Sequence, residues 1–363
     1  MKKVIYLVLL VSLLSCNKTE IPVKEEIKLK EYRSEDIYNK YQNSVVLIKH
    51  SFVYKMSIDG KDFFFRNFNS LTGEISDFIS YEEAVENPNT NWGTGFFIDN
   101  NGSILTNRHV VDVRPNETEQ KLILKGFKQK FENYFENMLA VHQNSINEYV
   151  QKMNYYNSGY NYSSSYELDS MKFNLEKDEE LLNNFRDYLD NFENMNNYVT
   201  KTSLEFGVFV NNQKTNSFKD YIKYKSKKIS NDPNVDLALL IPDNISDLQK
   251  INFSSADMSK IDSAQIKPLK ISDKVIMIGY NHGVELAVTD TGMKPQVTEG
   301  NISQMTDTNK VLYTIPALPG SSGSPIFDKF GRVVAVNFAG MTGTQSFNYG
   351  IQTLRIKQFL LNQ

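Results

Sequence analysis

The sequence predicts an all-β fold, a sandwich or a barrel, that carries one long helical hairpin as an insertion. The first observation is a series of short apolar and β-branched runs, separated by Gly, Pro, Asn and Asp, at residues 45–48 and again between residues 204 and 338. The second is a break in this rhythm over residues 126–199, where apolar residues keep a helical or heptad-like spacing. The sequence contains no internal repeat.

The expected elements follow one another with short turns between them. A short helix is expected near residues 34–38, ahead of the first strand. The Asn-Gly pair at residues 101–102 is typical of a hairpin turn between two strands. These strands lie at residues 96–98 and 104–106, and further strands are expected at residues 204–210, 221–224, 237–241, 275–278, 311–315 and 333–338.

The composition of the 363-residue chain excludes several classes of protein. A net charge of −3 leaves no basic surface of the kind that binds nucleic acid. A single cysteine excludes an intramolecular disulfide framework, and the four histidines lack the spacing of metal ligands. With 20 Tyr and 23 Phe the chain is too aromatic to be disordered. We therefore expect a folded protein with no nucleic-acid partner and no metal site.

The N-terminus has the pattern of a secretory signal. An apolar run of eleven residues, 4–14, follows two lysines and is too short to span a bilayer core, which needs about 20 residues. The run ends in Leu-Leu-Ser-Cys, which resembles the lipobox of bacterial lipoproteins. This resemblance implies a signal peptide at residues 1–15 and a diacylglycerol on Cys16, which is the anchor of a tether over residues 16–43. The alternative is an ordinary signal peptide with a stray cysteine.

Three segments carry residue types that suit nucleophilic catalysis. His109 follows a glycine-rich hairpin and a strand, Asp236 precedes an apolar strand, and Ser322 lies in a turn rich in Gly and Ser. Each residue alone has an ordinary structural explanation. Acyl transfer needs a hydroxyl, a base, a carboxylate that orients the base, and backbone N–H donors for the oxyanion. The three segments supply all of these, with the donors expected among Gly320, Ser321 and Ser322.

Together these segments resemble the trypsin-like serine peptidases of the chymotrypsin clan, and in particular the HtrA/Deg branch. Residues 105–111 resemble that branch's Leu-Thr-Asn-x-His-Val-Val, and residues 236–240 resemble its Asp-Ile/Leu-Ala-x-Leu. Residues 320–325 match Gly-x-Ser-Gly-Gly-Pro except at Ser324. The order His, Asp, Ser along the chain is also that of chymotrypsin.

The resemblance implies two perpendicular six-stranded β-barrels with the site between them, in a peptidase domain over residues 44–363 with insertions at residues 57–91 and 126–199. It also implies that His109 is the general base and acid, that Asp236 orients it, and that Ser322 is the nucleophile. No metal or nucleotide cofactor is needed for this chemistry. No PDZ domain is expected after the peptidase domain.

Two departures from the family bear on activation and specificity. Ser321 occupies the position of the Asp that pairs with a freshly cut N-terminus in trypsins, so such an N-terminus has no partner here. By family position, Leu318, Asn337, Phe338 and Ala339 line the specificity pocket, and none of them is charged. We therefore expect a small or medium apolar side chain before the scissile bond, with broad selectivity.

Two functions from different classes fit these observations. The first is an exported serine endopeptidase, lipid-anchored to a bacterial membrane, that hydrolyses exported or misfolded polypeptides. The second is a catalytically silent binding or scaffolding lipoprotein of the same fold, because fold alone does not establish function. The hairpin over residues 126–199 is the expected surface for a partner or for self-association. All three residues of the expected triad are present, which favours the first function.

Overall fold

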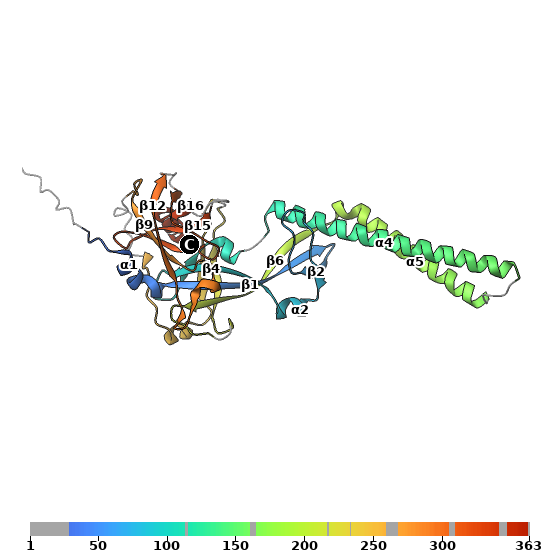
Figure 1. Cartoon of the computed structure of the whole chain (residues 1–363), viewed down its shortest axis with the longest axis horizontal. Helices are drawn as coiled ribbons and strands as arrows, with labels where there is room; N and C mark the ends of the chain where they lie inside the picture. The colour runs from blue at the N-terminus through green and yellow to red at the C-terminus, as the bar shows by residue number, and fades with distance from the viewer. Residues whose placement is uncertain are drawn as a thin grey trace, which may run out of the picture.

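The computed structural model describes residues 29–112, 115–159, 165–215, 218–232, 234–258, 268–304, 309–340 and 347–361. A β-rich body carries a long arm that projects from one side, away from helix α1 (Figure 1). The expected signal peptide and Cys16 lie outside the described residues. In the part of the chain that the structure describes, no helix has the length and apolar character needed to cross a bilayer.

Six strands form the first barrel, in the order β1-β4-β5-β8-β7-β6, and the pairing of β6 with β1 closes it. All six neighbouring pairs are antiparallel. The strands are β1 (Val45–Ile58), β4 (Asn89–Phe97), β5 (Ile104–Thr106), β6 (Tyr198–Val210), β7 (Ile222–Ile229) and β8 (Ala238–Pro242). Two short 3₁₀ helices, η1 (Gln42–Ser44) and η3 (Ile245–Lys250), flank this barrel.

A second barrel closes in the order β12-β13-β16-β15-β14-β9. Its strands are β9 (Lys274–Gly279), β12 (Gln296–Gln304), β13 (Lys310–Tyr313), β14 (Pro325–Asp328), β15 (Val333–Gly340) and β16 (Asn348–Gln352). The prediction of two six-stranded barrels is confirmed. Smaller elements connect or cover the strands: α6 (Val284–Ala287), β10 (Val288–Thr289), β11 (Gly292–Met293) and the C-terminal helix α7 (Thr353–Leu361).

Alternation along β1 shows how the barrels join. Val46 and Ile48 lie in the core of the first barrel, whereas Val45 and Leu47 lie in a cluster that includes Ile276 and other residues of the second barrel. Because successive side chains of a strand point to opposite faces, one β-branched run can fill both the barrel and the interface. The two barrels therefore share a continuous apolar contact, which fixes the position of one barrel relative to the other.

The N-terminal segment packs on the second barrel. Helix α1 (Ser34–Tyr41) buries Ile37, and the ring of Tyr41 stacks on Phe327 with 4.5 Å between ring centroids. The Tyr41 hydroxyl donates to the carbonyl of Gly331 at 2.8 Å, and the Tyr32 N–H donates to the carbonyl of Lys329 at 2.8 Å. The expected helix is thus present, but the expected tether is shorter than residues 16–43, because the segment from Tyr32 onward is part of the body.

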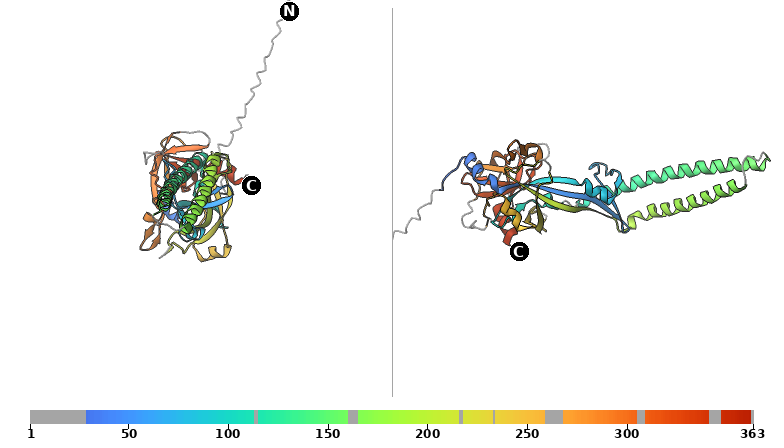
Figure 2. Two further views of the ribbon diagram at one scale, coloured as in Figure 1. Left: turned by 90° about the vertical axis from the view of Figure 1, so that its right-hand side faces the viewer. Right: turned by 90° about the horizontal axis from the view of Figure 1, so that it is seen from below.

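The two insertions form one arm. Strands β1 and β6 remain paired from the barrel to the base of the arm. There β2 (Lys61–Phe65) and β3 (Phe78–Ile79) extend the sheet, and the helix α2 (Tyr81–Glu86) follows β3. The arm continues as the helices α4 (Glu117–Asn157) and α5 (Ser165–Asn191), which lie side by side in Figure 2, followed by the short turn η2 (Phe192–Asn194). With 41 residues, α4 is roughly 60 Å long.

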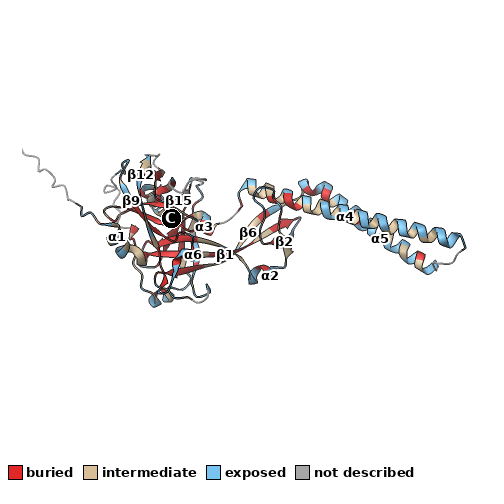
Figure 3. Ribbon diagram, in the orientation of Figure 1, coloured by how far each residue is buried: buried red, intermediate tan, exposed pale blue. Residues whose placement is uncertain are grey.

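Helix α4 begins nine residues before the boundary that the sequence indicated at residue 126. The side chain of Asn116 accepts from the N–H of Glu119, and the Glu119 side chain accepts from the N–H of Asn116, which is a capping box. Ile123 and Phe127 are buried at the base of the arm against Phe65 and Phe192. Residues 122–124 are as apolar as a short strand, which hid the helical start. Beyond this base most of the arm is exposed (Figure 3).

Candidate active site

His109 and Asp236 are in direct contact. His109 lies in the short helix α3 (Arg108–Val111), directly after β5, and Asp236 lies in the loop before β8. The Nδ1 atom of His109 is 2.5 Å from Asp236 Oδ2, and the backbone N–H of His109 donates to Asp236 Oδ1 at 3.0 Å. Because a carboxylate only accepts, Nδ1 carries the proton and Nε2 is left as the basic nitrogen. The sequence predicted this pair, and the structure brings it together.

Both partners are positioned by their neighbours. The Asn107 side chain donates to the backbone carbonyl of Asp236 at 2.9 Å, so the loop that carries the carboxylate is joined to the end of β5. The Asp236 side chain is only 14% exposed, whereas that of His109 is 45% exposed. The imidazole therefore faces the solvent with its orienting carboxylate behind it.

His50 holds the other side of helix α3, and the sequence offered no signal for this role. Its Nδ1 lies 3.1 Å from the carbonyl of Val110, and its Nε2 lies 2.9 Å from Ser203 Oγ. A carbonyl only accepts, so Nδ1 donates and Nε2 accepts from the serine hydroxyl. Burial lowers the pKa of His50 to about 4, because the charged imidazolium would lose its hydration.

We expect His50 to make the stability of the protein depend on pH. An unfolded histidine has a pKa near ~6.5, so below that pH the unfolded chain binds a proton that the folded protein does not. The stabilisation is complete above about pH 6.5 and is lost as the pH falls toward 4, by about 3 kcal/mol in all. Urea denaturation at a series of pH values measures this loss. In His50→Gln the amide still donates to Val110, but it does not titrate. The loss of unfolding free energy over this pH range should therefore be smaller than in the wild-type protein, and an equal loss in both proteins contradicts the assignment.

Ser322 lies on the loop that joins β13 to β14, on the second barrel. The N–H of Thr94 in β4 donates to the Ser322 carbonyl at 2.8 Å, and the Asn91 side chain of the same strand donates to the His109 carbonyl at 3.2 Å. Three residues of a strand span about 10 Å, so β4 links the two groups across the barrel interface. Among the hydrogen bonds of the described residues, none joins Ser322 Oγ to His109.

The turn around Ser322 offers two free backbone donors. Within the described part of the chain, the amides of Gly320 and Ser322 donate no hydrogen bond, whereas the Ser321 amide donates to the carbonyl of Leu318 at 3.0 Å. The prediction that Ser321 is a third donor is wrong, because its N–H is already used inside the turn. Gly320 has a φ of 93°, which a residue with a side chain rarely adopts. Two amides beside a partly exposed serine hydroxyl can stabilise an oxyanion.

Comparison with sequence families gives one match, to the family described as Trypsin-like peptidase domain, over residues 195–336. Residues 195–336 are therefore similar to a trypsin-like peptidase domain. The matched segment contains Asp236 and Ser322. Among curated protein sequences, none matches the chain.

Solved structures of two proteases are similar to this chain. One is a protease from M. tuberculosis in its active form, with 13% identity and a TM-score of 0.40, covering 89% of this chain and 82% of that one. The other is a serine endoprotease from Yersinia pestis, with 13% identity and a TM-score of 0.43, covering 92% of this chain and 67% of that one.

The residues expected to line the specificity pocket of the peptidase domain do not all do so. Asn337 is buried, and its side chain contacts the turn around Ser321, so its assignment to the pocket is corrected. Phe338 is half-buried against Tyr349, with 6.3 Å between ring centroids. Leu318 is half-buried, and Ala339 pairs with Tyr349 in the β15–β16 ladder. None of these contacts places a charge in the pocket.

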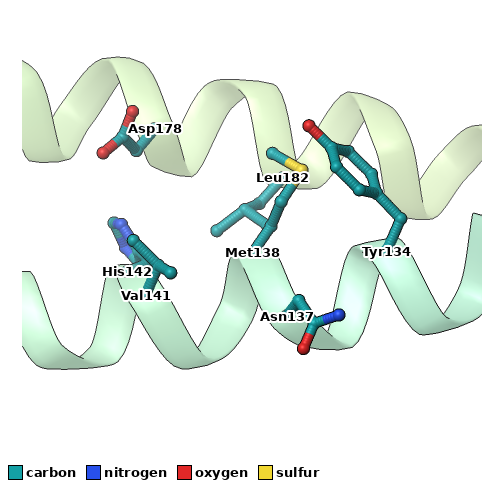
Figure 4. A pocket seen from close by; sticks show the side chains of 7 residues that line it. All are labelled: Tyr134, Asn137, Met138, Val141, His142, Asp178 and Leu182. Carbon is teal, nitrogen blue, oxygen red and sulfur yellow. The ribbon is translucent and has the colours of Figure 1, made fainter.

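An open cavity of about 360 Å³ lies beside His109. It is built by the first barrel and by the base of the arm, and its lining residues are Phe52, Thr90, Asn91, His109, Asp112, Glu119 and Lys201. A second hollow, of about 300 Å³, lies between α4 and α5, where Figure 4 shows Met138, His142 and Leu182 around it. The first contains an expected catalytic residue, whereas the second lies on the arm.

Proposed function

We propose that this protein is a serine endopeptidase that cleaves polypeptides through an acyl-enzyme on Ser322. The observation that carries the proposal is the double contact of Asp236 with His109, through both Nδ1 and the backbone N–H. This contact places the proton of the neutral imidazole on Nδ1 and leaves Nε2 as its basic nitrogen, on a side chain that is 45% exposed. The fold of the peptidase domain and the free amides of Gly320 and Ser322 support the same reaction.

The groups act in a fixed order in this mechanism. Ser322 Oγ attacks the carbonyl carbon of the scissile bond while His109 Nε2 takes its proton, and the Gly320 and Ser322 amides donate to the oxyanion. The C–N bond then breaks, and the imidazolium returns the proton to the leaving amine. Water, with His109 again as base, hydrolyses the acyl-enzyme. Asp236 remains ionised and stabilises the imidazolium throughout.

The leaving side of the substrate fits the cavity beside His109, because the imidazole must reach the departing nitrogen. The other side fits the second barrel, where uncharged pocket residues favour a small or medium apolar side chain before the scissile bond. The proposed substrates are exported or misfolded polypeptides. The reaction uses only the groups of this chain, so we expect it to need no cofactor.

Covalent labelling of Ser322 tests the proposal. A fluorophosphonate transfers its phosphorus to an activated serine with loss of fluoride, so the purified protein should be labelled at Ser322, as read by peptide mass spectrometry. Ser322→Ala should be folded, unlabelled and inactive on peptides. The matched control is Ser255→Ala, which removes a half-buried hydroxyl that donates to Asn100 Oδ1 at 3.0 Å, in a loop outside the site. A folded wild-type protein that takes no label instead supports a binding or scaffolding protein of the same fold.

The proposed location is a bacterial membrane, to which Cys16 is anchored by its lipid. The support is the lipobox resemblance of residues 13–16. The wild-type protein should fractionate with membranes. The Cys16→Ala protein should be soluble or should keep its signal peptide. A Cys16→Ala protein that remains on membranes in high salt contradicts the anchor.

A further inference from the structure

We infer that Asn337 is a positioning residue that orients the Ser322 amide toward the oxyanion, so that the nucleophile turn is ordered without a charged partner or a cut N-terminus. The inference rests on the proposed function, since it concerns the donors of the same reaction. It assigns to Asn337 a role in place of the pocket wall expected from the sequence.

The contacts of Asn337 all point to the turn or to the barrel core. Its Nδ2 donates to the carbonyl of Ser321 at 3.0 Å and to Ser321 Oγ at 3.1 Å. Its Oδ1 accepts from the Tyr313 hydroxyl at 2.6 Å. Because a carbonyl only accepts and a side-chain amide donates only through nitrogen, these partners also fix which way the amide faces. Asn337, Ser321 and Tyr313 are all buried.

The geometry of the peptide bond converts this contact into an orientation. The carbonyl of Ser321 and the N–H of Ser322 belong to one planar trans peptide, in which C=O and N–H point in opposite directions. Asn337 holds the Ser321 carbonyl toward the core of the second barrel. The Ser322 N–H is therefore turned away from that core, and within the described residues it donates no hydrogen bond.

The other donor is held in an equivalent way by the backbone. The N–H of Gly320 shares a peptide with the carbonyl of Pro319, which accepts from the N–H of His282 at 2.7 Å. The Thr94 hydroxyl, from the first barrel, donates to the Gly320 carbonyl at 2.8 Å and fixes the next peptide. The Gly320 donor is thus oriented by a backbone contact, whereas the Ser322 donor is oriented by the side chain of Asn337, which a mutation can remove.

The network is neutral and complete. Ser321 Oγ donates to the Leu318 carbonyl at 2.6 Å and accepts from Asn337, so this buried hydroxyl has both a donor and an acceptor as partners. Trypsins order the same turn with a carboxylate at this position, which needs a cation. Here hydrogen bonds alone satisfy the buried groups, and they are already in place in the uncut chain.

The test is Asn337→Ala in the full-length protein, with three measurements. We expect kcat on a peptide to fall about 100-fold, as for loss of one oxyanion donor, with KM changed less than about 3-fold. A peptide aldehyde, to whose carbonyl Ser322 Oγ and its proton add, forms an oxyanion-like adduct, and its affinity should fall in parallel with kcat. The cleavage product forms no such adduct, so its affinity should stay the same.

Thr353→Val is the matched control for stability. The Thr353 hydroxyl is buried and donates to the Val333 carbonyl at 2.9 Å, in the same barrel but away from the turn. It should lower the melting temperature and leave kcat unchanged. An Asn337→Ala protein that behaves like this control overturns the inference.

Tyr313→Phe provides a second variant, should Asn337→Ala not fold. It removes the hydroxyl that donates to Asn337 Oδ1 and that also lies 3.0 Å from the Tyr349 carbonyl. We expect a roughly 10-fold loss of kcat with unchanged KM, whereas an unchanged kcat overturns the inference. The experiments distinguish a failure of the proposed function from a failure of the role of Asn337. An unlabelled wild-type Ser322 contradicts that function, whereas a labelled protein with unchanged kcat in these variants contradicts only the role of Asn337.

Discussion

Replacing Asp236 by asparagine should lower kcat about 10⁴-fold while leaving both barrels folded. The reason lies in the two contacts of the carboxylate. Oδ1 accepts from the His109 backbone N–H, and an asparagine oxygen can still do so. Its NH₂ group then faces His109 Nδ1, which must become an acceptor. The imidazole proton moves to Nε2, and the nitrogen that should receive the Ser322 proton is blocked.

This change is measured as kcat on a peptide together with the melting temperature. Asp232→Asn is the matched control, because Asp232 is exposed in the loop before Asp236 and its side chain accepts from the Asn234 N–H in a local turn, a bond that asparagine preserves. It should keep kcat within about twofold. A fully active Asp236→Asn protein removes Asp236 from the triad.

Gly320→Ala should lower kcat by about 100-fold or more and also destabilise the second barrel. A Cβ atom at this position lies 2.5 Å from both the Gly283 nitrogen and the Tyr280 carbonyl oxygen, and these are backbone atoms that cannot rotate away. The φ of 93° adds strain for any residue with a side chain. The turn must move to relieve the clash, and the Gly320 amide moves with it.

Gly331→Ala separates backbone strain from the effect on the site. Gly331 also has a positive φ, of 71°, but its added Cβ meets nothing nearer than a Tyr41 ring carbon at 3.6 Å. It should cost about 1–2 kcal/mol of stability and leave kcat unchanged. If Gly320→Ala does no more than this, Gly320 is not one of the oxyanion donors.

The strands and the expected site residues could be predicted because their signals are local. The run at residues 45–48 and the turn at residues 99–102 identify elements through neighbouring residues alone, and both elements are present. The motifs around His109, Asp236 and Ser322 are likewise short and contiguous. Strands β12, β14 and β16 were harder to predict as strands. In β12, half-buried positions alternate with exposed ones and most residues are polar, and the other two strands have only four or five residues.

The features that could not be predicted depend on contacts between distant segments. His50 meets Val110 and Ser203, 60 and 153 residues away, only because β1, α3 and β6 come together at the base of the arm. Asn337 was assigned to the pocket by its position in the family, whereas its side-chain direction is set by Tyr313 and Ser321. The docking of α1 was hidden because it depends on contacts with distant residues, such as the stacking of Tyr41 on Phe327 and the burial of Ile37.

The continuity of β1 gives the arm a mechanical link to the first barrel. One unbroken strand of 14 residues runs from the barrel into the arm, so a load applied at the helical tip cannot be absorbed by a loose joint along it. The register with β6 shifts between Ser51 and Phe52, and a bulge is where such a ribbon bends most easily. His50, whose ring supports the helix of His109, immediately precedes this point. We therefore expect bending of the arm at this bulge to move His50, and with it the Val110 carbonyl that His50 contacts.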